Sequence, residues 1–371
     1  MNKGRSFLRK VFVFINIFAA AGLLLSYAAA YISPGRFWFL AFFGLSYPVW
    51  LLINTVFVLL WLVLFHKMFF VSLVCILLGW NNLLAIYPFR FSDPVAGTGA
   101  RIRIISYNVH SLYGNQRDVI IPETKSRVTE FLSRQDADIV CIQEFFAIGE
   151  EYTRTLGKFS GSIKLDHYYF RNYQEFWNKT KINAIATFSR YPVVREDHFK
   201  LPDHSVYAIY TDILLNHDTI RVYNLHLESI RFGDDDYSFY SHLTEPDKEK
   251  TPISEGSRRM FGKLRKAFIL RATEVDVLSR SIDECPYPVI LAGDFNDTPS
   301  SYSYHQLTRK LTDSFREAGN GFFESTYAGK FPAFRIDYLL HSKHFTAGAY
   351  KKFNVDLSDH YPISATMVFH P

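Results

Sequence analysis

Hydrophobic residues are arranged differently in the N-terminal quarter of the chain and in the remainder. The N-terminal quarter holds three long runs without any charged residue, at 11–32, 37–65 and 68–89. A helix that crosses a bilayer needs about 20 apolar residues. The first and third runs fit that length, and the second is long enough to tilt or to kink at Pro48. The pattern predicts three transmembrane helices.

Other interpretations of these runs fit the sequence less well. A cleaved signal peptide has a shorter apolar stretch and is not followed by two further spans. A buried hairpin of a soluble protein would need polar surface, which these runs lack. A small transporter usually carries ionisable residues within its spans, and these runs carry none. We therefore expect a membrane anchor.

The distribution of basic residues predicts how the anchor is oriented. Cytoplasmic loops are enriched in Lys and Arg, and the first run is preceded by Lys3, Arg5, Arg9 and Lys10. The N-terminus is therefore expected in the cytoplasm. Three spans place everything after residue 91 on the opposite side, which for a bacterial inner membrane is the periplasm. The segment 92–100, SDPVAGTGA, predicts a flexible linker.

From residue 101 the apolar runs become short and often alternate with polar residues. Such runs predict strands, at 101–109, 137–144, 205–216, 218–229, 287–297, 334–342 and 361–369, with a strand pair or a strand and turn over 181–194. Helical spacing predicts helices over 124–136 and 258–283. Together these elements predict an α/β or α+β catalytic domain over 101–371. The segment 230–257 is polar and predicted to be irregular, and we expect it to border the site and to shape substrate choice.

Charge and cysteine content narrow the functional classes. Residues 1–95 hold seven of the 41 basic residues and one of the 36 acidic residues, so the rest of the chain is nearly neutral. It lacks the overall basic character of a dedicated nucleic-acid binder, although a local basic patch stays possible. Cys75, Cys141 and Cys285 show neither zinc nor redox spacing, which predicts three free thiols. A Cys141–Cys285 disulfide is the alternative in a secreted domain.

Polar residues occur repeatedly where predicted strands end or begin. They are Asn108, Glu144, His226, Asp294, Asn296, Asp337, Asp359 and His360. Singly, each is typical of a turn or a cap. Jointly, carboxylates with an amide suit a hard divalent cation such as Mg²⁺, and histidines beside carboxylates suit stabilising or protonating a phosphoryl oxygen. The set predicts a metal-assisted phosphoryl hydrolase.

Seven short segments carry a resemblance to a known family. In chain order they are SYNVHS, IVCIQE, ATFSRYPV, YNLHLES, VILAGDFND, FRIDYLL and LSDHYPI. They resemble the blocks of the endonuclease/exonuclease/phosphatase superfamily, which has the fold of deoxyribonuclease I, and the resemblance covers about residues 101–370. It implies an α/β, four-layer sandwich of two packed mixed β-sheets flanked by helices, with the site at one end. In this chain the sandwich would follow the three transmembrane helices.

The resemblance also implies a role for each strand-end residue. Glu144 would be the principal ligand of Mg²⁺ or Mn²⁺, supported by Asn108 and with Asp359 nearby.

The remaining five residues would act on the substrate and on the attacking water. Asp294 would orient or deprotonate the water, and Asn296 would hold the scissile phosphate or that water. His226 would donate a hydrogen bond to the phosphate. His360, paired with Asp337, would stabilise charge on the phosphoryl oxygens.

Some positions depart from the family pattern or stay unassigned. Ala184 stands where the family often has glycine, a change between small residues. His110 follows Asn108 closely, but the neighbouring position varies in the family, so it receives no role. Some family nucleases use a further Tyr or His, and the segment 166–177 offers several without distinguishing among them.

The predicted function is a membrane-anchored, divalent-metal-dependent hydrolase of phosphate esters, of the phosphodiesterase or nuclease type. Its partners are the phosphate-ester substrate and the membrane, and no protein partner is implied. Within the enzyme class, the alternative is a lipid or sugar-phosphate phosphodiesterase. Outside it, the alternative is an inactive module that binds or senses phosphate ligands.

Overall fold

The computed structural model describes residues 3–88, 99–112, 122–148, 152–176, 181–200, 206–244, 253–319, 324–329 and 334–371. Contacts divide the chain into two units. One comprises Met1–Tyr87, Ile230–Thr273 and Thr298–Gln306, and the other Pro88–Ser229, Glu274–Asp297 and Leu307–Pro371. This division groups two later segments with the N-terminal helices. Most of the expected linker 92–100 lies outside the described residues, so the domain boundaries stay a prediction.

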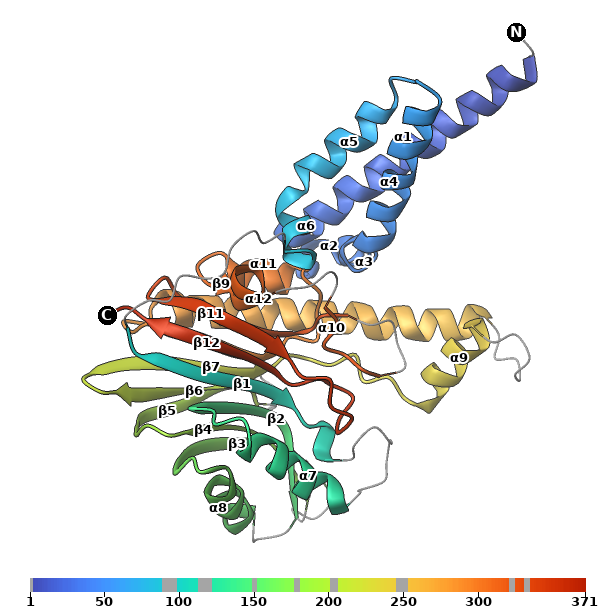
Figure 1. The fold of residues 1–371 in the computed structure, drawn as a ribbon. Coiled ribbons are helices and arrows are strands. Elements are labelled where there is room, and N and C mark those ends of the chain that lie inside the picture. Colours follow the sequence, from blue (N-terminus) through green and yellow to red (C-terminus); the bar gives the residue numbers. More distant parts are fainter. Residues whose placement is uncertain are drawn as a thin grey trace. The chain divides into compact units, whose positions relative to one another are not determined.

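The second unit contains two six-stranded sheets (Figure 1). The first has the order β11 (Phe345–Lys352), β12 (Ile363–Phe369), β1 (Arg101–Asn108), β2 (Ile139–Ile148), β4 (Lys181–Ser189) and β3 (His167–Phe176). The second has the order β5 (Val193–Lys200), β6 (Val206–Leu215), β7 (Asp218–His226), β8 (Val289–Asp294), β10 (Asp337–His341) and β9 (Thr312–Asp313). The pairs β1–β2 and β7–β8 are parallel, and the other pairs are antiparallel. Both sheets are therefore mixed, as expected.

Apolar residues from both sheets pack into a common core. Successive side chains of a strand point to opposite faces, and β1 follows this rule: Ile102 and Ile104 join the core that both sheets share, whereas Ile105 and Tyr107 join a separate cluster. That cluster includes Val128 of α7 (Pro122–Ser133) and residues of α8 (Tyr152–Ile163), so these helices cover the outer face of the first sheet.

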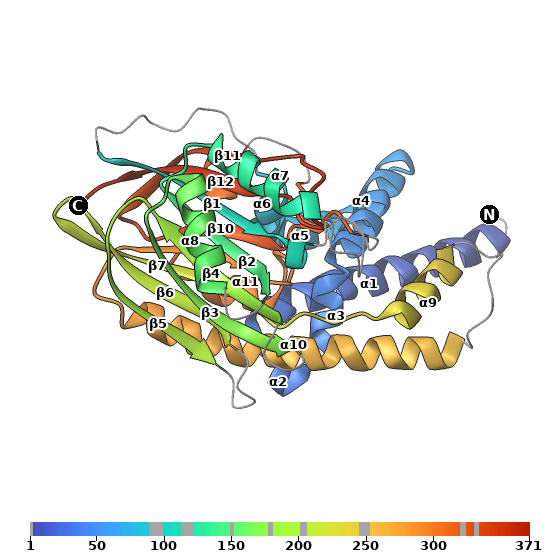
Figure 2. The same cartoon turned by 90° about the horizontal axis from the view of Figure 1, so that it is seen from below.

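Helices also cover the second sheet. The last part of α10 (Ile253–Asp283) runs beside this sheet (Figure 2). Ser281 of α10 and Tyr223 of β7 are joined by a hydroxyl–hydroxyl bond of 2.9 Å. The short helix α12 (Ser314–Ala318) contacts β10 and β11, and α11 (Tyr302–Thr308) precedes it in the chain. The flanked sandwich that the sequence predicts is confirmed.

The segment 230–257 is not irregular throughout, contrary to the prediction. It contains α9 (Asp234–Thr244) and the start of α10, while residues 245–252 lie outside the described residues. Buried Asp236 explains the order: its carboxylate accepts bonds from Gly233 N, from Arg259 Nε and from Lys263 Nζ. Phe239 is buried as well. A polar sequence thus folds because a few buried contacts anchor it.

The first unit begins with six helices. They are α1 (Lys3–Tyr31), α2 (Pro34–Phe37), α3 (Phe39–Leu45), α4 (Tyr47–Val63), α5 (Phe69–Leu78) and α6 (Trp80–Ile86). Within α1, Phe7–Tyr31 is long and apolar enough to cross a membrane. The pairs α3–α4 and α5–α6 meet the same test only together, since they bend by 61° and 68°. Among the described residues there are thus between one and three candidate spans.

The two bends have local causes. The α3–α4 bend lies at Ser46, and Pro48 occupies the first turn of α4, where its missing N–H costs no helical hydrogen bond. The α5–α6 bend lies at Gly79, which ends one helix and precedes the next. A bend in the second apolar run was expected at Pro48, and it occurs two residues earlier.

Buried polar side chains join the N-terminal helices. Asn16 in α1 donates to the hydroxyl of Ser72 in α5 and accepts from Trp61 Nε1 in α4 at 2.9 Å. Asn54 in α4 donates to the carbonyl of Ala19 at 2.9 Å. Interhelical hydrogen bonds of this kind are typical of helices packed in an apolar medium.

The N-terminal helices also contact later segments of the same unit. The Phe42 ring lies 5.0 Å from the Phe261 ring, and the Tyr31 ring lies 4.3 Å from the imidazole of His305. Gly44 is buried, and a Cβ there would lie 3.0 Å from the carbonyl oxygen of Ser300. The absence of a side chain thus lets this helix approach the segment 298–306 closely.

Candidate functional site

The strand topology brings the predicted residues to one end of the sandwich. Parallel strands β1 and β2 carry Asn108 and Glu144, and parallel strands β7 and β8 end at His226 and Asp294. The antiparallel strand β10 begins at Asp337, directly opposite Asp294. Hydrogen bonds and ion pairs link these residues with Asn296, Asp359 and His360 into one network. All eight predicted residues therefore lie together.

Asp294 is the most enclosed carboxylate of this network. Its Oδ1 accepts the backbone N–H of Asn296 at 2.7 Å, and its Oδ2 accepts Asn108 Nδ2 at 3.0 Å. Burial raises the pKa of Asp294 to about 6, with nearby Asp337 acting in the same direction and the imidazole of His360 opposing it. Asp294 thus exchanges a proton close to neutral pH, as a general base requires.

Asn296 reaches the site through a turn. Asn296 does not continue the extended chain of β8, because it has a left-handed φ of 51°. The Asp294 side chain accepts the N–H two residues on, an arrangement in which Asp often makes a turn. Asn296 Nδ2 then lies 3.0 Å from the carbonyl oxygen of Leu227 and 3.3 Å from Asp294 Oδ2.

Gly293 precedes Asp294 at a point of close backbone contact. Its φ is +147°, and a Cβ there would lie 2.0 Å from the carbonyl oxygen of Leu225 in β7. Glycine permits this close approach because it has no Cβ.

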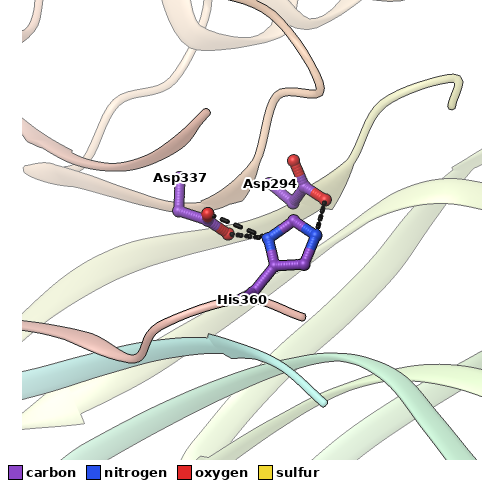
Figure 3. A group of neighbouring side chains, drawn as sticks. All are labelled: Asp294, Asp337 and His360. Atoms are coloured by element: carbon purple, nitrogen blue, oxygen red, sulfur yellow. Dashed lines mark hydrogen bonds and ion pairs between the residues drawn. The ribbon is translucent and has the colours of Figure 1, made fainter. Parts of the chain in front are cut away.

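The imidazole of His360 lies between two carboxylates (Figure 3). Its Nδ1 is 3.0 and 3.2 Å from the oxygens of Asp337, and its Nε2 is 3.6 Å from Asp294 Oδ2. Burial acts to lower the pKa of His360, but Asp337, Asp294 and Asp359 outweigh it and raise the pKa well above its usual value. Asp337 is held by a bond from its own N–H to Thr326 Oγ1 at 3.0 Å. The imidazolium is therefore fixed in position.

Glu144 has looser surroundings. It has a left-handed φ of 55° and lies where the pairing of β2 with β4 shifts register. Its side chain is 20% exposed, and its contacts with Asn108 Nδ2, Ser111 Oγ and His226 Nε2 measure 3.3, 3.4 and 3.4 Å. Burial acts to raise the pKa of Glu144, but His226 and other nearby histidines outweigh it, so the pKa is lowered. Glu144 therefore stays ionised.

Asn108 lies between the two carboxylates and acts as a donor. Its Nδ2 contacts both Glu144 and Asp294, and its Oδ1 accepts the backbone N–H of His110 at 3.0 Å. In this arrangement Asn108 orients the two carboxylates. To act as a direct metal ligand beside Glu144, as expected, Asn108 would need its amide oxygen, and not its Nδ2, to face Glu144.

Asp359 and His110 lie beside Glu144. Asp359 is 22% exposed, and its Oδ1 is 3.5 Å from His110 Nδ1. His110 also lowers the pKa of Glu144. Sequence reasoning left His110 without a role, although its place two residues after Asn108 was a visible signal. Ser111, which contacts Glu144, carried no such signal.

Further polar residues missed by sequence reasoning hold the strand ends together. Gln143 Nε2 donates to Asn224 Oδ1 at 2.7 Å, and Asn224 Nδ2 donates to the carbonyl of Ala186 at 2.8 Å, so the two sheets are joined by buried hydrogen bonds next to Glu144. Ser358 Oγ donates to the carbonyl of Asn108 at 2.8 Å. These residues are scattered in the sequence, and nothing in their spacing predicts the contacts.

The donor chemistry around Glu144 fits a hard divalent cation. Such ions prefer oxygen ligands and keep several waters. Glu144 and Asp359 are partly exposed carboxylates, and their side-chain contacts with Asn108, Ser111, His226 and His110 are 3.3 Å or longer. A second group, Asp294, Asp337 and His360, has ligand atoms within 4.8 Å of one another. In that group the imidazole is already hydrogen-bonded to Asp337.

Comparisons with known proteins were made for sequence and for structure. A model described as the Endonuclease/Exonuclease/phosphatase family matches residues 105–360, and a model described only as a domain of unknown function matches residues 9–86. No curated protein matches the chain significantly in sequence.

Many solved structures resemble the chain, and two of them illustrate the resemblance. An endonuclease/exonuclease/phosphatase from Beutenbergia cavernae shares 16% identity over 73% of this chain and 72% of its own, with a TM-score of 0.51. D. rerio TDP2 complexed with single strand DNA product shares 16% identity over 72% of this chain and 99% of its own, with a TM-score of 0.50. At this identity, the resemblance concerns the fold alone.

Proposed function

The chain belongs to the endonuclease/exonuclease/phosphatase family, whose members are metal-dependent phosphoesterases, and from this we propose that it cleaves phosphate diesters at a membrane surface. A water attacks phosphorus, the catalytic unit lies outside the cytoplasm, and Mg²⁺ or Mn²⁺ is the cofactor. The observation that carries the proposal is the buried arrangement of Asp337, His360 and Asp294, in which an imidazolium and a base of raised pKa face each other.

Each residue has a task in this reaction. Asp294 takes a proton from the attacking water, and Asn296 and Asn108 hold its carboxylate in place through their amides. His360, kept charged by Asp337, donates a hydrogen bond to a phosphoryl oxygen as negative charge builds there.

The remaining residues hold the phosphate and the cation. His226 Nε2, which lies 3.4 Å from Glu144 and 3.7 Å from Asp294, is placed to donate to the phosphate. Glu144, with Asp359 nearby, would hold the divalent cation. When bound, that cation neutralises charge on the phosphoryl oxygens.

An inactive phosphate sensor is the alternative outside the enzyme class. A binding module needs cationic donors for phosphate, but it gains nothing from a buried carboxylate with a pKa of about 6 next to the ligand, because that charge repels phosphate. The ionisable pair at Asp294 and His360 therefore favours catalysis.

Contacts within the first unit support an odd number of membrane crossings. Tyr31, at the end of α1, contacts His305, and Phe42, in α3, contacts Phe261. Two residues that contact each other outside the bilayer lie on the same side of it. The chain therefore crosses the membrane an even number of times between Phe42 and Phe261. Together with α1, this gives one crossing or three. Either count supports our proposal that the catalytic unit lies opposite the basic N-terminus, outside the cytoplasm.

The substrate is a nucleic acid or a phosphate ester at the bilayer surface. The D. rerio TDP2 structure holds a DNA product, whereas the nearly neutral charge of this chain beyond residue 95 gives no general attraction to a long polyanion. One observation favours a lipid headgroup. The segment Thr298–Gln306 begins shortly after Asp294 in the chain, and it contacts the N-terminal helices: His305 contacts α1, and Ser300 contacts α3. A membrane tether also raises the effective concentration of such a substrate.

A substrate panel tests the proposal. The full chain in detergent, with and without Mg²⁺ or Mn²⁺, is given DNA, RNA, phospholipids and inositol phosphates, and phosphorus-containing products are measured. We expect metal-dependent release from at least one class and none from the Asp294→Asn variant. Equal turnover in excess EDTA, or in that variant, would contradict the mechanism. Binding without turnover by the wild type would support the sensor alternative.

A further inference from the structure

One surface of the first unit combines exposed aromatic side chains with cations. The residues Gly35 to Phe39, in and beside α2, are all exposed, and Phe37, Trp38 and Phe39 are 43%, 38% and 44% exposed. Phe261 of α10 is 55% exposed. Isolated exposed apolar residues are common, but a run of three aromatics next to a fourth is typical of a docking surface.

The cations lie on one face of α10. Arg258, Phe261, Arg265 and Lys266 are exposed and follow helical spacing, so they share one side of the helix. Glu255 lies on the same side and leaves this face with a positive balance. The half-buried Arg259 and Lys263 belong elsewhere, because both pair with buried Asp236.

A cation–aromatic contact joins the aromatic run to the helix face, and a second lies within the run. The Arg265 guanidinium lies 5.1 Å from the centre of the Trp38 ring, and the Arg36 guanidinium lies 5.6 Å from that of Phe37. Phe42 packs against both Phe261 and Phe268. We define the aromatic–basic surface as Arg36, Phe37, Trp38, Phe39, Arg258, Phe261, Arg265 and Lys266.

We propose that the aromatic–basic surface binds the anionic headgroups of phospholipids at the bilayer surface. This inference rests on the membrane attachment in the proposed function. The surface directly follows α1, whose residues up to Tyr31 form a candidate span. Aromatic side chains concentrate at the level of the headgroups, and Lys and Arg can extend their charged ends toward phosphates while their alkyl stems contact apolar groups. Charge and position thus both favour anionic lipid over another occupant.

The inference has a consequence for the catalytic residues. The helix that carries the cations is continuous as far as Asp283, and its buried Glu274 accepts the backbone N–H of Glu228, two residues after His226. The same helix that carries the cations thus also holds the chain beside His226.

Lipid retention by the full chain tests the inference. The protein, purified in detergent, is titrated with phosphatidylglycerol or phosphatidylcholine, and bound lipids are counted by native mass spectrometry. The wild type should bind phosphatidylglycerol more tightly than phosphatidylcholine. The double variant Arg265→Gln/Lys266→Gln should bind it about thirtyfold more weakly. The matched control Arg195→Gln/Lys200→Gln, which removes two exposed cations of β5, should bind it like the wild type.

Two results would overturn the inference. One is equal affinity for phosphatidylglycerol in the wild type and in the Arg265→Gln/Lys266→Gln variant. The other is a wild-type dimer that the same variant dissociates, which would assign the surface to a second copy of the chain. Hydrolysis of a soluble diester, bis(p-nitrophenyl) phosphate, is measured in parallel and should be unchanged in the variant. A wild type without hydrolysis would refute the proposed function and leave the lipid result standing.

Discussion

Glu144 and Asp294 occupy equivalent places in the two sheets, yet their surroundings differ. Each belongs to a strand of a central parallel pair, and both contact Asn108. Glu144 is one-fifth exposed, its contacts with Asn108, Ser111 and His226 are 3.3 Å or longer, and its pKa is lowered. Asp294 is buried, accepts a bond of 2.7 Å, and has its pKa raised.

This comparison teaches that the position of a residue does not determine its protonation. Burial disfavours the charged form of a carboxyl, and positive neighbours favour it. Around Glu144 the histidines prevail, so the carboxylate keeps its charge, which a cation ligand needs. Around Asp294 burial and Asp337 prevail, so the carboxylate can exchange a proton near neutral pH.

The largest effect is expected from Asp294→Asn. The amide keeps the shape of the side chain but cannot accept a proton from water, so the turnover rate should fall by about 10⁴-fold. Turnover is measured on bis(p-nitrophenyl) phosphate, with circular dichroism as the control for folding. Turnover above a tenth of the wild type in a folded variant would show that the base lies elsewhere.

A somewhat smaller and different effect is expected from Glu144→Gln. The neutral amide binds a divalent cation weakly, so activity at low Mg²⁺ should fall by about 10³-fold and recover partly when Mg²⁺ or Mn²⁺ is raised. Activity of the Asp294→Asn variant should not recover. If both variants responded alike to added metal, the division between a metal side and a base side would be wrong.

Removing the partner of His360 should have an intermediate effect. The Asp337→Asn variant lacks the carboxylate that contributes most to raising the pKa of His360, so that pKa falls. The charged imidazole is then lost at a lower pH, and the alkaline limb of the pH–rate profile should move to lower pH, with a rate loss of about 10². Exposed Asp218→Asn is the control and should leave the profile unchanged. If the alkaline limb did not shift in Asp337→Asn, that limb would not result from deprotonation of His360.

The mildest test changes only the pH. Below the pKa of Asp294, at about 6, the base becomes protonated, so kcat/KM should fall about tenfold for each further pH unit. Activity is lost at this pH because the pKa of Asp294 is raised. An aspartate with an ordinary pKa would stay ionised, and the protein active, down to about pH 4. A midpoint of the acid limb near 4 would contradict the assigned environment of Asp294.

The sequence predicted the strands that lie inside the sheets and the residues at their ends. β1, β2, β7 and β8 have strong apolar patterns because both faces are covered, and the polar residues beyond them were therefore visible. β3 and β11 were missed, since each is an edge strand, and in β11 buried and exposed positions mix. Edge strands bury less and so leave a weaker pattern.

Within the site, residue identity was predictable but local geometry was not. Glu144 has a left-handed conformation where the strand pairing shifts register, and Asn296 has one in the turn made by the Asp294 side chain. Neither conformation was predicted from the sequence. The contact of His110 with Asp359 joins residues 249 positions apart, and the Gln143–Asn224 bond joins the two sheets. Such contacts arise only once the sheets have packed.

Calorimetric titration with Mn²⁺ tests the central claim, that Glu144 holds the cation while Asp294 and His360 carry out proton transfer and charge stabilisation. Wild type, Glu144→Gln and Asp337→Asn are compared at one pH in the same detergent. We predict that Glu144→Gln weakens Mn²⁺ binding at least about tenfold, while Asp337→Asn stays within about threefold of the wild type. The reverse order, with binding lost in Asp337→Asn and kept in Glu144→Gln, would place the cation at Asp294, Asp337 and His360 and contradict the account.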